Sequence, residues 1–96
     1  MIEQSTSCII EKETISQIKF PKEDVLQDKD KKKTRAYYLN RASQLGNLLK
    51  NKVNIYFKDA EDKLMRVNTT IWAVTKHNVI LKKGTIIPRH RIVYVD

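Results

Sequence analysis

The sequence predicts a mainly β fold, with one N-terminal α-helix followed by a small, strongly bent five-stranded barrel. Three observations carry this prediction. Short runs of β-branched and aromatic residues, separated by polar breaks, fill residues 69–95, which is typical of closely spaced strands. A helical stripe lies earlier in the chain, and the alternating segment 64–74 loses its alternation midway. A strand with such a break usually bends, as it must at a barrel corner.

Charge density divides the chain into two parts. Residues 1–33 hold seven basic and seven acidic residues, and their scattered apolar residues fit no regular period, so a strand pair and a weak helix both stay open. We expect this part to be a polar, poorly ordered leader, because its charged end cannot bury enough surface to offset its ordering entropy. Residues 34–96 hold twelve basic and four acidic residues, and therefore the whole net charge of +8. We expect them to form one domain.

Composition removes several classes of function. The single cysteine, Cys8, excludes an internal disulfide and suits the cytoplasm. No apolar stretch has the length of a signal peptide core or a membrane span, so we expect neither. The spacing of cysteine and histidine indicates no metal site, and the two glycines form no phosphate-binding loop. We therefore expect no cofactor and no enzymatic activity.

The helix is predicted over residues 34–49. One face of it carries an apolar stripe, which consists of Tyr38, Ala42, Leu45 and Leu49. Thr34 is placed to act as its N-cap. Gly46 has two interpretations, because it either ends the helix in a left-handed cap or lies inside it. Tyr37 and Tyr38 point to adjacent faces, so at most one of them belongs to the core.

Five strands are predicted after the helix, over residues 52–57, 64–74, 79–82, 85–87 and 92–95. The first alternates Val53, Ile55 and Phe57 with polar residues and Tyr56, as a half-buried strand does. Trp72 lies where the second strand should bend, and we expect it to fill a core or a subunit contact rather than stack on a base. Pro88 lacks an N–H group and so marks the end of a strand or an edge.

Basic residues cluster in the turns between these strands. They are Lys76 and His77, Lys82 and Lys83, and Arg89, His90 and Arg91. Loops of a small barrel collect at its two ends, so several of these turns should form one positive rim. Arginine offers a planar fork for phosphate or guanine, and histidine offers a stacking face. The predicted ligand is therefore a polyanion, first of all a nucleic acid.

Residues 34–96 resemble the Sm-like family, and most closely its bacterial host-factor (Hfq) branch of RNA chaperones. The run Val74-Thr75-Lys76-His77-Asn78-Val79-Ile80-Leu81-Lys82 is similar to the first family motif, with Thr75 where the family has Asp. Pro88-Arg89-His90-Arg91-Ile92 is similar to the second, at His90 and Ile92 and conservatively at Arg89. The ending Ile92-Val93-Tyr94-Val95 is similar to the last strand of the Sm branch.

The resemblance implies a ring of subunits, joined by strand four of one subunit and strand five of the next. It also implies that uridine-rich RNA lies near the pore, in contact with the positions of Arg89 and His90. Independently of the family, a folded part of this size lies near the lower limit for a self-sufficient core. Because exposed sheet edges invite pairing, we expect the chain to form a homo-oligomer.

Two functions follow as hypotheses. In the first, the protein binds single-stranded RNA through a basic rim, where Arg89, His90 and Arg91 contact phosphate and base. Four further residues of the rim add electrostatic attraction, namely Lys76, His77, Lys82 and Lys83. In the second, the chain is an SH3-like protein-interaction or scaffolding module without nucleic-acid binding, in which an edge strand and Trp72 take a protein partner.

Overall fold

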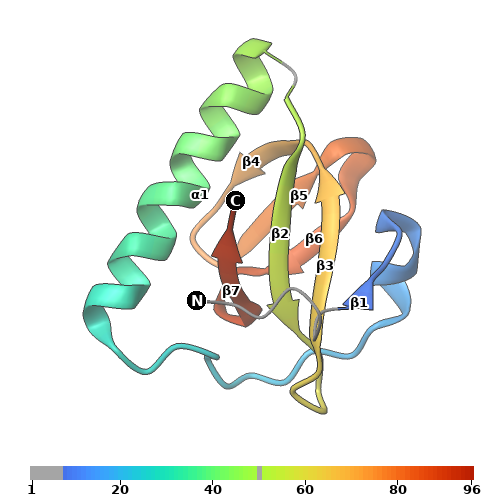
Figure 1. Cartoon of the computed structure of the whole chain (residues 1–96), viewed down its shortest axis with the longest axis vertical. Coiled ribbons are helices and arrows are strands. Elements are labelled where there is room, and N and C mark those ends of the chain that lie inside the picture. Colours follow the sequence, from blue (N-terminus) through green and yellow to red (C-terminus); the bar gives the residue numbers. More distant parts are fainter. Residues whose placement is uncertain (1–7, 50) are drawn as a thin grey trace.

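The structure is a computed structural model that describes residues 8–49 and 51–96 (Figure 1). In these residues a long helix, α1 (Lys29–Leu49), stands against two sheets. The strands are β1 (Cys8–Ile9), β2 (Val53–Lys58), β3 (Leu64–Thr69), β4 (Ile71–Val74), β5 (Asn78–Leu81), β6 (Ile86–Pro88) and β7 (Ile92–Val95). Short 3-10 turns are η2 (Lys12–Gln17), η3 (Lys82–Gly84) and η4 (Arg89–Arg91). The described chain is a small mixed helix and sheet protein.

Helix α1 begins at Lys29, five residues before the predicted start at Thr34. The cause is Asp28, whose Oδ1 accepts a hydrogen bond from the amide of Asp30 (2.8 Å), as an N-cap side chain does. Thr34 lies inside the helix, where its hydroxyl donates to the Asp30 carbonyl (2.9 Å). Gly46 also lies inside the helix, so the interpretation in which it ends the helix is wrong.

The buried face of α1 differs in part from the predicted stripe. Ala42 is buried as expected, but Leu39 is fully buried and Tyr38 is 44 % exposed. Leu39 and Ala42 are three positions apart and therefore share a face, which the helix turns toward β4 and β7. The side chains of Leu45 and Leu49 lie outside the described ones.

The first sheet has the strand order β1-β3-β2-β7. β2 pairs in antiparallel register with β3, where Ile55 lies opposite Val67, and with β7, where Tyr56 lies opposite Tyr94. Ile55 and Phe57 are fully buried, as their predicted inward positions require, but Tyr56 on the opposite face is buried as well, so this strand is not half-buried as predicted.

One long bent strand connects the two sheets. Only Thr70 separates β3, which belongs to the first sheet, from β4, which belongs to the second sheet, of order β4-β5-β6. The pairing of β4 with β5 shifts between Ile71 and Ala73, which is a bulge. The predicted break of the second strand is therefore confirmed. Pro88 ends β6, an edge strand of this sheet, as its missing N–H group predicts.

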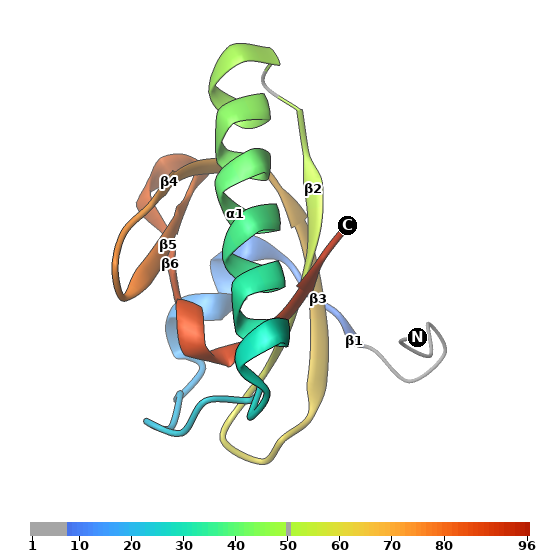
Figure 2. The same cartoon turned by 90° about the vertical axis from the view of Figure 1, so that its left-hand side faces the viewer.

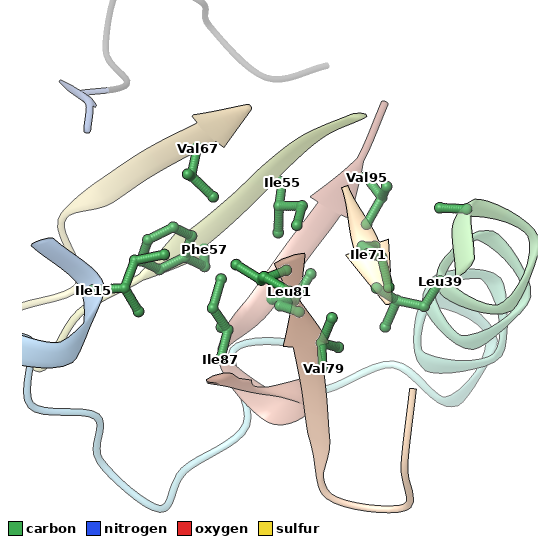
Figure 3. Packing of buried hydrophobic residues seen from close by; sticks show 12 residues of the cluster. Ile15, Leu39, Ile55, Phe57, Val67, Ile71, Val79, Leu81, Ile87 and Val95 are labelled. Carbon is green, nitrogen blue, oxygen red and sulfur yellow. The ribbon is translucent and has the colours of Figure 1, made fainter. Parts of the chain in front are cut away.

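The core lies between the two sheets and the helix (Figure 3). Its fully buried side chains come from every strand from β2 to β7, from α1 and from η2, and Figure 3 shows Ile55, Ile71, Leu81 and Ile87 meeting in its middle. Trp72 does not belong to this cluster, because its side chain is 47 % exposed. The expectation that Trp72 fills the core is therefore wrong, whereas a subunit contact there stays a prediction.

The segment before α1 packs against the domain from residue 8 on. Ile15 of η2 is fully buried within the core, and the ring centroids of Phe20 and Phe57 are 5.9 Å apart. The amide of Ile10 donates to the Arg66 carbonyl (2.9 Å) next to the short parallel pair of β1 and β3. Residues 1–7 lie outside the described residues, so the division of the chain at residue 33 stays a prediction. The segment 8–28 nevertheless has contacts that a solvated leader lacks.

Candidate functional site

Four of the seven predicted site residues line one hollow, of about 220 Å³, at the end of the second sheet. Lys76 and His77 come from the turn between β4 and β5, and Arg89 and His90 come from η4. Figure 2 shows this turn and η4 on the same side of the molecule, beside the N-terminal half of α1. We call this site the Arg89 hollow; Asp24 and Arg35 complete its lining.

The turn between β4 and β5 is closed by Thr75. Its hydroxyl oxygen accepts a hydrogen bond from the amide of Asn78 (3.0 Å), and its amide donates to the Asn78 carbonyl (2.8 Å). A short side chain that bonds to the backbone three residues on fixes a tight turn. Lys76 and His77 form the tip of this turn and are exposed. The position at which the resembled motif has Asp thus has a turn-closing role in this chain.

Two hydrogen bonds from Arg89 hold η4 against that turn. The Arg89 amide donates to the carbonyl of His77 (2.9 Å), and Nη1 of its side chain donates to the carbonyl of Thr75 (2.7 Å). The cations of two turns separated by a whole strand pair are therefore close together by construction. The pairing of β5 with β6 brings these two turns to the same end of the sheet. Because this is a tertiary contact, the sequence alone could not show which of the basic turns meet.

His90 connects the hollow to the segment before α1. Its Nε2 lies 2.7 Å from the carbonyl oxygen of Pro21, and its own carbonyl accepts a hydrogen bond from the Val25 amide (2.9 Å). The ring is half-buried as a result. The predicted solvated segment therefore packs against His90, and it contributes Asp24 to the lining of the site.

Arg91 points into the protein, unlike its neighbours in the sequence. Its side chain is only 3 % exposed. The guanidinium donates to the carbonyls of Glu23 (2.8 Å), Lys58 (3.1 Å) and Asp59 (2.8 Å), and to Oδ1 of Asp62 (3.0 Å). A side chain so placed joins η4, the β2–β3 turn and the segment before α1. It is not available to contact RNA, so the role predicted for Arg91 is replaced by a structural one.

Asp24 and Arg35 also line the site, although no pattern in the sequence predicts them there. Arg35 donates to both carboxylate oxygens of Asp24 (2.9 Å each) and to the carbonyl of Ile92 (2.9 Å). Burial alone would raise the pKa of Asp24, but the hydrogen bonds from Arg35 and from the Leu26 amide outweigh it and lower the pKa. Asp24 therefore stays ionised and neutralises Arg35, which leaves Lys76 and Arg89 as the cations of the hollow that have no ion pair among the described residues.

Lys82 and Lys83 lie apart from this site. They belong to η3, at the opposite end of β5 from the β4–β5 turn, and both are exposed (Figure 2). Lys83 has a positive φ of 69°, which is unusual for a residue other than Gly, Asn or Asp. The single basic rim that the sequence predicts is thus divided between two ends of the second sheet.

Comparison with protein-family models, with curated proteins and with solved structures finds no match to this chain. Within residues 8–49 and 51–96, no cluster of His, Cys, Asp and Glu is placed to hold a metal ion. In the same residues, no helix is both long and apolar enough to cross a membrane. The site is therefore interpreted from its own geometry, which offers cations, two imidazole rings and a polar hollow.

Proposed function

We propose that this chain is an Sm-like RNA-binding protein in which the strands from β2 to β7 form a five-stranded bent barrel. The topology supports the barrel, because β3 and β4 continue one strand from the first sheet into the second. β7 then follows a 3-10 turn and returns to pair with β2. This path brings both ends of the strand set to the same sheet, as closure of a barrel requires.

The convergence of cations in the Arg89 hollow carries the functional proposal. Two separate turns supply Lys76 and Arg89, and the hydrogen bonds from Arg89 hold these turns together. Of the three guanidinium nitrogens of Arg89, only Nη1 has a hydrogen-bond partner among the described residues. The N–H groups of the other two are therefore open to a ligand. A preformed site of this kind binds a polyanion without reorganising, which favours affinity.

We assign the contacts by the chemistry of each side chain. Lys76 and Arg89 attract phosphate, and the rings of His77 and His90 supply faces for stacking against bases. Single-stranded RNA rather than a duplex is the proposed ligand, because stacking needs bases that are not paired. Lys82 and Lys83 contribute only long-range attraction, which falls off over roughly 10 Å at physiological salt.

We also propose that the chain self-associates and acts in the cytoplasm, where its single cysteine stays reduced. β6 is an edge strand; the Thr85 carbonyl before it accepts from the Leu81 amide of β5, and the Arg89 amide after it donates to the His77 carbonyl next to β5. By alternation, the N–H and C=O groups of Ile86 point away from β5, while Pro88 offers a carbonyl only. A neighbouring strand that pairs here would bond mainly with Ile86, which makes this edge weaker than an ordinary one.

The test is the affinity for a short oligouridine, measured by fluorescence anisotropy at about 50 and about 200 mM salt. The decisive variant is Lys76→Glu, and the matched control is Lys83→Glu, which makes the same change at the other end of β5. We expect Lys76→Glu to weaken binding about tenfold and to reduce the salt dependence by about one phosphate contact. Lys83→Glu should change the affinity by less than about threefold.

Two outcomes would contradict the proposal. If the unaltered protein does not bind oligouridine at the lower salt concentration, RNA binding is wrong, and the SH3-like interaction module remains as the alternative. If Lys76→Glu and Lys83→Glu weaken binding equally, the protein attracts RNA by its net charge alone and the Arg89 hollow is not the site. Light scattering of the same samples measures self-association separately.

A further inference from the structure

The outer face of the second sheet carries a continuous apolar row. Ala73 of β4 lies opposite Ile80 of β5, and Ile80 lies opposite Ile86 of β6, so their side chains share one face. This is the face turned away from the core, because Val79 and Leu81, the neighbours of Ile80 in the strand, are fully buried. Ile86 is 49 % exposed.

The bulge in β4 adds Trp72 to this face. Ile71 is fully buried and Val74 packs against the core, yet the two residues between them both point outward. A bulge sets two residues of one strand opposite a single residue of its partner and re-aims a side chain. Here it turns Trp72, 47 % exposed, to the side of Ala73. We call the surface of Trp72, Ala73, Ile80 and Ile86 the Trp72 face.

Two lysines border the Trp72 face. Lys82 and Lys83 of η3 lie between the end of β5 and the start of β6, next in the chain to the strands that carry Ile80 and Ile86. Both side chains are exposed, and neither forms an ion pair within the described part of the chain. Lys83 adopts a left-handed backbone conformation, in which glycine or asparagine has a lower conformational energy than lysine.

We propose that the Trp72 face is the docking site of a protein partner whose binding segment combines large apolar side chains with acidic residues. The apolar row and Trp72 would bury the apolar side chains, as aromatic and aliphatic anchors do at the centre of interfaces. Lys82 and Lys83 would pair with the acidic residues at the rim. A second copy of this chain is disfavoured at this face, because it would bring its own Lys82 and Lys83 against these two lysines.

This site is independent of the proposed RNA site. The Arg89 hollow lies at the other end of β5, and none of the residues that line it belongs to the Trp72 face. Failure of RNA binding would therefore leave the docking proposal untouched, and failure of docking would leave the RNA proposal untouched.

The single tryptophan makes the test direct, because Trp72 is the only indole in the chain. Its fluorescence emission reports on the polarity around this one face. The probes are short synthetic peptides without tryptophan, in which leucine, isoleucine and phenylalanine alternate with glutamate in varied order. A matched set carries lysine in place of every glutamate. We expect the glutamate peptides to shift the emission to shorter wavelength in a saturable manner, and the lysine peptides to leave it unchanged.

Variants then locate the contact. Ile86→Ser should weaken peptide binding at least about tenfold, because it removes one apolar anchor. The matched control is Ile9→Ser, the same change at an isoleucine that is 70 % exposed on the other sheet, and it should have no effect on peptide binding. Both are surface changes, and circular dichroism checks that each variant folds. Lys82→Glu and Lys83→Glu should each weaken peptide binding about threefold, while changing the affinity for oligouridine by less than that.

Four results would overturn the proposal. In the first, no glutamate peptide shifts the Trp72 emission at millimolar concentration. In the second, the lysine peptides shift the emission as much as the glutamate peptides do. In the third, Ile86→Ser and Ile9→Ser weaken peptide binding equally. The fourth is a shift of Trp72 emission that depends on protein concentration or on added oligouridine and is lost in Ile86→Ser. That result would assign the face to a second copy of the chain or to RNA.

Discussion

The two ends of strand β5 carry similar charge and differ in surroundings. At one end the β4–β5 turn presents Lys76 and His77, and at the other end η3 presents Lys82 and Lys83. The first pair meets Arg89 and His90 across two hydrogen bonds and shares a hollow with them. The second pair does not line that hollow and borders an apolar sheet face instead.

The difference shows that a basic dipeptide has little meaning until its neighbours in space are known. A pair of exposed lysines adds to the general attraction of the protein for anions, which salt screens beyond about one Debye length. A second cationic turn, held by hydrogen bonds of Arg89, makes such a pair part of the polyanion site that we propose. An adjoining apolar face makes the same kind of pair the rim of the protein contact that we propose.

The largest effect on stability should come from Arg91, which joins η4 to the β2–β3 turn and to the segment before α1. Arg91→Leu removes a buried guanidinium that donates to three carbonyls and to Asp62. We expect it to lower the free energy of unfolding by about 3 kcal/mol, because buried acceptors lose their donors. Arg89→Leu, two residues earlier, should cost about 1 kcal/mol or less, since this side chain is half exposed.

Urea denaturation followed by Trp72 fluorescence measures both values. Oligouridine binding separates the two roles, because Arg89→Leu should weaken it in a protein that remains folded. Equal destabilisation by the two variants would mean that Arg91 has no special anchoring role and that the contrast within η4 is wrong.

A smaller effect, with its own pH dependence, should come from Asp24. Its pKa is lowered, so the ionised carboxylate stabilises the folded protein. This contribution is complete above the ordinary pKa of an aspartate and is lost as the pH falls through the lowered value in the folded protein. We expect Asp24→Asn to cost about 1–2 kcal/mol at pH 7, because it weakens the charge-assisted pair with Arg35.

The measurement is the free energy of unfolding of both proteins between about pH 7 and about pH 3. The difference between them should be constant down to about pH 5 and should shrink below that. Glu61→Gln, at an exposed carboxylate without an ion pair among the described residues, is the control. A difference that does not change with pH would mean that Asp24 acts through its shape rather than its charge.

Local pattern predicted the strands well, because strand pairing repeats every two residues and leaves a visible trace. The inward positions of β2, the bend before Trp72 and the edge position of Pro88 were all present in the sequence. Helix α1 was harder to place. Its first turn is almost entirely charged, which resembles a linker, and only the cap formed by Asp28 extends the helix to Lys29.

The site was predictable only in part, because it is made by tertiary contacts. Lys76, His77, Arg89 and His90 lie together, as one basic rim would require, and their role in binding stays a prediction. Composition could not separate Arg89 from Arg91 within one tripeptide. Burial of Arg91 depends on carbonyls that lie more than thirty residues away along the chain. The pair of Asp24 and Arg35 was missed for the same reason, since no periodic pattern marks an ion pair between a loop and a helix.

The smallest expected effect lies at the end of β5 that holds η3. Lys83 adopts a positive φ, and asparagine tolerates this conformation better than lysine. Lys83→Asn should therefore raise the free energy of unfolding by about 0.5 kcal/mol, whereas Lys82→Asn, at a residue without a positive φ, should leave it unchanged. Urea denaturation of the two variants side by side checks this, and equal effects would mean that no backbone strain is relieved. Oligouridine affinity should change by less than about threefold in both variants, and each variant should bind the glutamate peptides more weakly. A chain that becomes more stable and docks less well on losing Lys83 would indicate that this lysine serves binding at the expense of the fold.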